Sequence, residues 1–192
     1  MILKMFQDIF ENKKFLSPQD LISMASITKI RRIKKGEHLA RSGDINYLIV
    51  IVVKGLLRHY IIDEEGNEKT MLFVTEKQNS ASIETIVRDE VCTENIVAEE
   101  NSILLSFDHR SAQKVASKSK GLVFLQNQRL KESLYHAVER LRHHTTLSPE
   151  ERFTLFYAEF PKLGRRVKQK HLASYLGVTP TSLSRMKRRL MP

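Results

Sequence analysis

The last quarter of the chain, residues 168–190, has the spacing of two short helices joined by a tight turn. Leu172 and Leu176 give the first helix an apolar face, and the small Ala173 lets a second helix pass close to it. Gly177 stands where the turn needs a left-handed backbone, which glycine adopts without steric strain. This spacing predicts a helix-turn-helix. The alternative is an ordinary helical hairpin with a solvated basic face.

The second helix of this pair has a well-marked start. Thr179 is suited to cap it, and Pro180 falls in its first turn, where the missing N–H is not needed. Leu183 and Met186 form its inward face. In a helix-turn-helix the opposite side, near the start of this helix, enters the major groove of DNA. That side holds the three predicted base-reading residues: Thr181, Ser182 and Arg185.

Positive charge is concentrated in the same region. From Pro161 to the C-terminus there is no Asp or Glu, and this stretch carries nine positive side chains out of a formal net charge of +10. Lys and Arg side chains that face phosphates release counterions on binding, so this uneven charge predicts double-stranded DNA as a partner. The alternative is a ligand-sensing signalling module whose basic tail docks an acidic partner.

Composition excludes several other classes of protein. No apolar run approaches the roughly 18 residues that a membrane span needs, and residues 1–10 are too polar for a secretory signal, so we expect a cytoplasmic protein with no membrane partner. The single cysteine, Cys92, excludes an internal disulfide and a four-thiolate cluster within one chain. We predict a buried structural thiol there, with a redox role as the alternative. The sequence holds no nucleophile elbow, phosphate loop or metal-binding helix motif, and we expect no enzyme activity.

The residue pattern in the first half of the chain is typical of a β-domain that follows a short helix. Ser17 and Pro18 mark the start of that helix, which should end before Lys29. Short strands are then expected at regular spacing, which is typical of an antiparallel sandwich or barrel. The predicted strands are Glu37–Arg41, Tyr47–Val53, Leu56–Ile62, Asn67–Val74, Ile83–Val87, Val91–Ala98 and Ile103–Phe107.

A long helix is predicted from Lys118 to Thr146, because this stretch has no Pro and no Gly apart from Gly121. One stripe along it has the spacing of a two-stranded seam, with a single polar residue that can set register. The predicted dimer-interface residues are Val123, Asn127, Leu130, Leu134, Ala137 and Leu141. Alternatively, the stripe packs on the β-domain of its own chain, as we expect for Leu122, Phe124 and Leu125.

A new helix should start at Ser148, with Glu151 as the acid of a capping box. We therefore predict an α+β fold in three parts. Residues 1–117 form an N-terminal helix and a β-rich sensor domain, 118–146 a dimerisation helix and hinge, and 147–192 a DNA-binding domain. A short hinge between two such parts allows rigid-body rotation.

This order of parts resembles the Crp/Fnr family of bacterial transcription regulators. The turns Lys35–Glu37, Gly43–Asp44, Gly55–Arg58 and Asp63–Gly66 resemble the successive turns of the family's β-roll, and Gln169–Thr179 with Leu183–Arg185 is similar to the reader helices of the branch common in Bacteroidetes. The resemblance implies an N-terminal antiparallel, jelly-roll-like β-roll of the cyclic-nucleotide-binding type, a long dimerisation helix and a C-terminal winged-helix-type helix-turn-helix. It also implies a homodimer that acts on a palindromic operator, with RNA polymerase as a further candidate partner.

The resemblance also assigns roles to residues of the basic segment. Arg185 would donate to a guanine, and Thr181 stands where the relatives with the best-studied sites have glutamate, so we expect a different operator. Ser182, besides facing the groove, matches a phosphate-holding position in the family. The predicted phosphate contacts are Lys168, Lys170, Thr179, Lys187, Arg188 and Arg189.

The effector is where this chain departs from the family pattern. Relatives that bind cyclic nucleotides hold the phosphate on a Gly-Glu turn followed by an arginine, but here no glycine lies between Asn67 and Lys120. Arg88 is flanked by Asp89 and Glu90, so we do not expect cAMP to bind. Haem is not expected either, because the histidines of the β-half are scattered singly. They are His38, His59 and His109.

No cofactor and no metal site are predicted. The sequence leaves open whether the β-roll binds another ligand. His136 and His143 lie one heptad apart on the long helix, and His144 follows directly. These imidazoles could confer sensitivity to pH or to a metal, although no carboxylate or thiolate completes a recognisable metal set.

Overall fold

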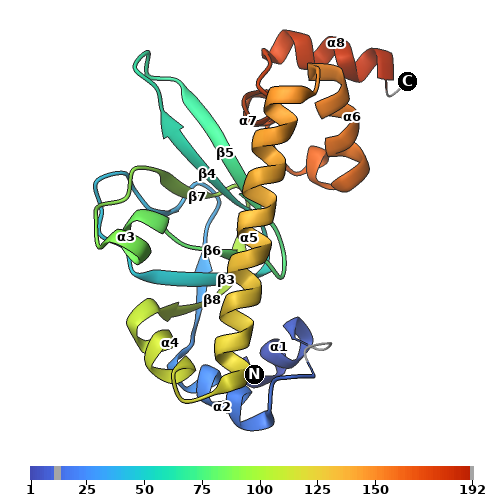
Figure 1. The fold of residues 1–192 in the computed structure, drawn as a ribbon. Coiled ribbons are helices and arrows are strands. Elements are labelled where there is room, and N and C mark those ends of the chain that lie inside the picture. Colours follow the sequence, from blue (N-terminus) through green and yellow to red (C-terminus); the bar gives the residue numbers. More distant parts are fainter. Residues whose placement is uncertain (11–13, 191–192) are drawn as a thin grey trace. The chain divides into compact units, whose positions relative to one another are not determined.

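The computed structural model describes residues 1–10 and 14–190. The chain divides into two compact units, of which the first holds Met1–Arg58 with Phe73–Leu130 and the second holds His59–Leu72 with the chain from Lys131 onward. Helix α5 (Lys120–Thr146) is continuous and contributes to both (Figure 1). Within the described residues, none of the helices is long and apolar enough to cross a membrane.

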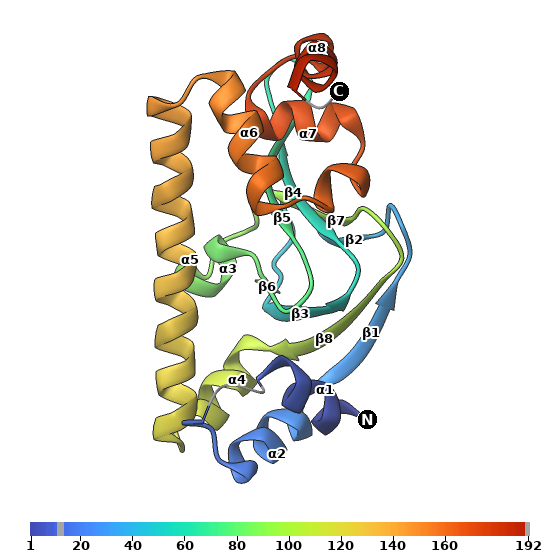
Figure 2. The ribbon, with the colours of Figure 1, turned by 90° about the vertical axis from the view of Figure 1, so that its right-hand side faces the viewer.

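Two four-stranded sheets make up the β-domain. Strand order is β1-β8-β3-β6 in one sheet and β2-β7-β4-β5 in the other, and the register of β1, β3 and β6 on their neighbours is antiparallel. Figure 2 shows β1, β8 and β3 side by side in the first sheet. The strands are β1 (Lys29–Ile33), β2 (His38–Ala40), β3 (Leu48–Lys54), β4 (Leu57–Ile62), β5 (Glu68–Val74), β6 (Asn79–Ser80), β7 (Asn95–Ala98) and β8 (Ser102–Asp108).

Apolar side chains from both sheets form one core. Val50 and Val52 of β3 and Leu104 of β8 are fully buried, together with Leu57 of β4 and Ile96 of β7. Alternation of inward and outward residues along antiparallel strands produces this arrangement. The predicted antiparallel β-domain is therefore confirmed, and most predicted strands agree with the observed ones to within two residues.

The strand predicted at Ile83–Val87 is wrong. These residues lie in α3 (Ile83–Arg88), a short helix that places acidic Glu84 in its first turn and basic Arg88 in its last. Both charges suit the helix dipole. The β-branched Ile83 and Val87 are exposed, so their strand preference, which depends on packing against a sheet, has no effect here. The strand predicted at Val91–Ala98 begins only at Asn95.

Three helices pack beside the first sheet. The predicted helix after Ser17 is confirmed as α2 (Pro18–Ile27), with a capping box between Ser17 and Asp20. Two others complete the layer: α1 (Ile2–Ile9), which we did not predict, and α4 (His109–Ala116). Phe6 of α1 is fully buried in a cluster that also contains Leu122 and Leu125 of α5.

The start of α5 therefore packs on its own chain, but only in part as expected. Leu122 and Leu125 are buried, whereas Phe124 is 46% exposed and meets Phe15 edge-on. Phe124 points away from the core because it lies one residue, or about 100° of helical rotation, from Leu125. The prediction that Phe124 joins the core is wrong.

The second unit is helical in its C-terminal part. Its helices are α6 (Pro149–Glu159), α7 (Gln169–Leu176) and α8 (Pro180–Leu190), with a 3-10 turn at Leu163–Arg165. The capping box of Ser148 and Glu151 at the start of α6 is confirmed. We predicted a winged-helix-type domain, but between residues 147 and 190 there is no strand. A β wing is thus absent from the described part of this segment.

Candidate nucleic-acid interface

Helices α7 and α8 are joined by the turn that the spacing predicted. Gly177 has φ +69°, in the left-handed region that favours glycine. The Oγ1 atom of Thr179 accepts a hydrogen bond from the backbone N–H of Ser182 at 3.1 Å, which caps α8. Leu183 and Met186 are buried on the inner face of α8. These local features of the helix pair are confirmed.

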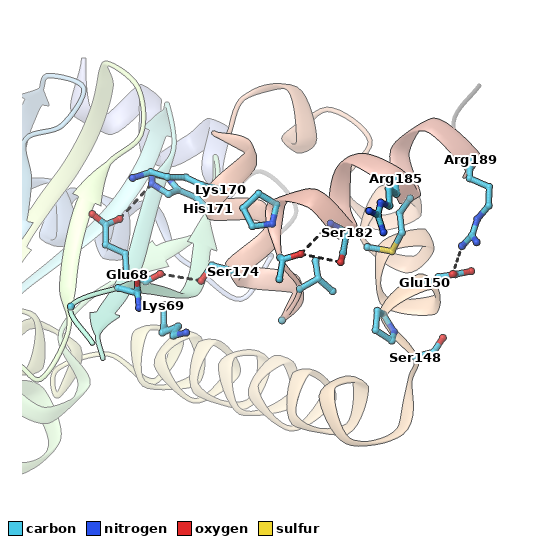
Figure 3. A pocket seen from close by; sticks show the side chains of 18 residues that line it. Glu68, Lys69, Ser148, Glu150, Lys170, His171, Ser174, Ser182, Arg185 and Arg189 are labelled. Carbon is cyan, nitrogen blue, oxygen red and sulfur yellow. Dashed lines mark hydrogen bonds and ion pairs between the residues drawn. The ribbon is translucent and has the colours of Figure 1, made fainter. Parts of the chain in front are cut away.

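The predicted base-reading residues are all on the solvent side of α8. Thr181, Ser182 and Arg185 are exposed. A groove of about 1380 Å³ runs beside this helix, lined by Ser182 and Arg185 together with Lys170 of α7. Figure 3 shows Lys170, Ser182 and Arg185 around the groove. The structure therefore places basic and hydroxyl side chains from both helices along one accessible surface.

The predicted phosphate contacts have different surroundings. Lys168, Lys170 and Thr179 are exposed, and so is Arg188. Lys187 lies over the ring of Tyr157, with Nζ 5.9 Å from the ring centre.

Arg189 forms an ion pair with Glu150 at the start of α6. That pair must open before the Arg189 guanidinium can bind a phosphate, so we expect Arg189 to contribute less than Lys170 to nucleic-acid affinity.

One wall of the groove was not predicted. It comes from the β4–β5 hairpin, whose residues Gly66–Lys69 line the groove opposite the two helices. The side chain of Ser174 on α7 donates a hydrogen bond to the Glu68 carbonyl oxygen at 3.2 Å and accepts one from the Thr70 N–H at 2.8 Å. Nothing in the local sequence around Ser174 indicates this contact, because its partners lie about a hundred residues away.

The predicted seam of α5 is a second accessible surface. Leu130, Leu134 and Leu141 are 68%, 63% and 66% exposed, an unusual state for leucine at helical spacing. Val123, Asn127 and Ala137 are exposed as well. All six predicted interface residues are therefore exposed.

The stretch that the resemblance matches to a cyclic-phosphate cradle leads into α3. Ser82 and Thr85 are buried at the start of α3, with their hydroxyl oxygens 3.2 Å apart. The Glu84 carboxylate lies in the first turn and accepts a hydrogen bond from Thr93 at 2.6 Å. Arg88 is at the opposite end of this helix. This short helix therefore carries a negative charge in its first turn and a positive charge in its last.

The histidines of the β-half are spread over different elements. His59 is buried in β4, while His38 and His109 are half-buried in β2 and α4. Across residues 1–10 and 14–190, His, Cys, Asp and Glu side chains form no group of three or more that could hold a metal ion. Cys92 is buried, as predicted, and its Sγ lies 3.7 Å from the Thr85 hydroxyl.

His144, at the C-terminal end of α5, lies among positive charges. Partial burial lowers the pKa of the His144 imidazole, and the guanidinium groups of Arg140 and Arg152 and the nearby His143 lower it further. A hydrogen bond to the backbone of Tyr175 acts in the opposite direction. The net effect is a pKa below the ordinary value, so the folded unit favours the neutral imidazole.

We expect this shift to make the second unit less stable in mild acid. The unfolded chain gains the His144 proton first as the pH falls below about 6.5, so the stability decreases in that range and levels off below the folded-state pKa. Thermal unfolding between pH 5.5 and 7.5 should therefore depend less on pH in His144→Gln than in the parent. His136→Gln, an exposed site on the same helix, is the control. An unchanged profile in His144→Gln would contradict the assignment.

Comparisons with known proteins agree with this geometry. Residues 30–119 match the family model of the cyclic nucleotide-binding domain. The fold is shared with FixK2 from Bradyrhizobium japonicum, at a TM-score of 0.74 and 16% identity over 85% of this chain and 84% of that one. In the search of curated proteins, no sequence matched the chain.

Two further solved structures extend the likeness. One, from Eubacterium rectale and assigned to the Crp/Fnr family of transcriptional regulators, has a TM-score of 0.72 and 18% identity over 95% of this chain and 87% of that one. The other is the c-di-GMP responsive global regulator CLP from Xanthomonas campestris, with a TM-score of 0.72 and 12% identity over 91% of each chain. Residues 30–119 thus match the model of a cyclic nucleotide-binding domain, and the chain shares its fold with the solved structures of these regulators.

Proposed function

We propose that the protein is a sequence-specific DNA-binding transcription regulator of the Crp/Fnr type that acts as a homodimer. The observation that carries this proposal is the exposed face of α8 beside the groove, where Ser182 and Arg185 adjoin Lys170 in a segment without acidic residues. A guanidinium at this place can donate to the O6 and N7 acceptors of guanine, and the ammonium groups can neutralise phosphates. The sensor is assigned to 1–117, the dimer helix to 118–146 and the DNA-binding part to 147–192.

Dimerisation follows from the exposed leucine stripe of α5. Two copies that pack their stripes together would bury this apolar surface and relate two α8 helices by a two-fold axis. Such a pair fits a palindrome whose half-site centres are about one helical turn apart. Asn127 would set the register of the two helices.

We further propose that cyclic AMP is not the effector. Glu84 at the start of α3 would repel the cyclic phosphate, and the buried hydroxyls of Ser82 and Thr85 already bond to each other. Haem is not proposed as the effector either, because the three histidines of the β-half lie on different elements, β2, β4 and α4. Isothermal titration with cAMP should give no heat of binding, and a stoichiometric heat would contradict this part of the proposal.

In vitro selection from a random duplex library tests the function. We expect enrichment of a palindromic sequence that the protein binds in a salt-dependent manner. A basic tail that serves only to dock an acidic partner would bind every duplex alike and enrich no sequence. That result would favour the signalling-module alternative over the proposed regulator.

Two substitutions separate base reading from phosphate binding. Arg185→Ala should reduce discrimination between the selected site and its variants at one base pair by about 10- to 100-fold, because a bidentate guanine contact is lost. Lys170→Ala should instead weaken binding to all duplexes and lower the slope of log affinity against log salt by about 1. Anisotropy titrations at several salt concentrations measure both quantities. Equal effects of the two substitutions on every sequence would show that the assigned roles are wrong.

A further inference from the structure

A hydroxyl group of α7 bonds to the outer edge of strand β5. Among the described strands, β5 is the last of its sheet, so one row of its backbone N–H and C=O groups faces away from the other strands. Ser174 bonds to two of these groups, since its Oγ accepts from the Thr70 N–H at 2.8 Å and donates to the Glu68 carbonyl at 3.2 Å. The hairpin is therefore attached to the first helix of the helix-turn-helix by its own edge.

Two further side chains, His171 and Arg140, contact the same part of the hairpin. The Nε2 atom of His171 on α7 lies 3.4 Å from the Glu68 carboxylate. Arg140 of α5 donates to the Thr70 carbonyl at 3.3 Å while its guanidinium stacks on the ring of Tyr175, 4.5 Å from the ring centre. Each contact is individually weak, so the hairpin can dissociate from α7 and bind to it again.

The docked segment places a carboxylate in the groove. Of the four acids in the hairpin, Asp63, Glu64, Glu65 and Glu68, Glu68 is the one that lines the groove, while Asp63 is paired with Lys69 at 3.0 Å. Gly66–Lys69 form one wall of the groove whose other wall carries the predicted DNA contacts (Figure 3). The Glu68 carboxylate at this place attracts the cations that a phosphate backbone would bind, and it repels the phosphates themselves.

We propose that the β4–β5 hairpin is an autoinhibitory element that competes with DNA for this groove. The inference rests on the proposed DNA-binding function. A duplex that seats on α8 brings its phosphates against the hairpin wall and its Glu68 carboxylate, so the hairpin must leave Ser174 and His171 for full contact. Docking of the hairpin and binding of DNA then oppose each other, and a change that weakens docking raises the apparent affinity for DNA by up to the same factor.

Substitution of Ser174 is the sharpest test, because it changes no charge. Ser174→Ala removes both backbone contacts and should tighten binding to the selected duplex by about three- to ten-fold. Glu68→Gln, on the hairpin side, should also tighten binding to the duplex, and it provides the test if Ser174→Ala does not fold. Ser117→Ala, at the residue that follows α4, is the uncharged control, and Glu90→Gln, an exposed acid of the first unit, is the control for the change in charge.

Hydrogen exchange provides a readout that does not depend on affinity. The Thr70 amide is protected by Ser174, so exchange in the 66–71 peptide should rise in Ser174→Ala, and in the parent protein when the duplex is added. Both increases, together with tighter binding, support the proposal.

Three results would overturn it. If the parent binds DNA but Ser174→Ala and Glu68→Gln bind no more tightly than their controls, the hairpin does not compete and the inference alone fails. Weaker binding by Ser174→Ala, or greater protection of 66–71 on addition of DNA, would show that the hairpin supports the complex instead. If neither the parent nor any variant binds a duplex, the proposed function fails, and the inference fails with it.

Discussion

Replacing Leu134 with glutamate is expected to convert the proposed homodimer to a monomer and to weaken binding to the selected palindromic duplex by about 100-fold or more. Leu134 is 63% exposed in the middle of the α5 stripe, between Leu130 and Leu141. In a dimer its side chain would be buried against the other copy, where a carboxylate without a partner is strongly unfavourable. A monomer then binds one half-site and loses the gain from simultaneous contact with both.

Tyr135→Glu is the matched control for this experiment. Tyr135 is adjacent to Leu134, is 62% exposed and has a mostly apolar side chain, and its substitution adds the same charge. Its side chain, however, points about 100° away from the stripe. Sedimentation equilibrium gives the oligomeric state, and anisotropy titration gives the affinity. If Leu134→Glu stayed dimeric and Tyr135→Glu became monomeric, the dimer interface would lie on the Tyr135 face of α5, and the assignment to the leucine stripe would be wrong.

Glu99→Gln is expected to lower the free energy of unfolding by about 3 kcal/mol or more. Glu99 and Arg58 are only 5% and 3% exposed, and the Arg58 Nε lies 2.5 Å from the Glu99 carboxylate. The amide keeps the shape of the side chain but removes the negative charge opposite the buried guanidinium. Loss of one partner of a buried ion pair is strongly destabilising because the other charge stays in a medium of low polarity.

Urea unfolding followed by circular dichroism measures this effect. Glu37→Gln breaks the partly exposed pair with Arg31, in which the charged atoms are 3.9 Å apart, and should change stability by less than about 1 kcal/mol. A double substitution, Arg58→Met with Glu99→Leu, should recover most of the loss, since both charges are removed together. A double variant no more stable than Glu99→Gln would show that packing, and not the buried charge, dominates.

Several local features were predictable because their atoms are close in the chain. The capping boxes at Ser17 and Ser148 join residues three positions apart, and each forms as expected. The left-handed turn at Gly177 depends only on the absence of a side chain. The exposed stripe of α5 also follows from spacing along one helix, so the residues of the candidate interface could be named in advance.

The errors have a common physical origin. Ile83–Val87 has the composition of a strand, but these residues do not join a sheet, and strand preference is mainly a preference for packing on one. Phe124 is as apolar as Leu125, yet rotation along the helix leaves it outside the core. Composition indicates that a side chain prefers burial, and the position of its neighbours determines whether burial is available.

The amino-acid sequence was sufficient for the basic helix pair, the seam helix and the antiparallel β-domain, because helix caps, periodicity and net charge are properties of neighbouring residues. The groove wall formed by Gly66–Lys69 could be found only in the folded chain. Ser174 and Thr70 are 104 positions apart, and their contact requires the β4–β5 hairpin to present the edge of β5 to α7. Such a contact leaves no periodic signal, since an edge strand bonds through its backbone, which is the same for nearly every residue type.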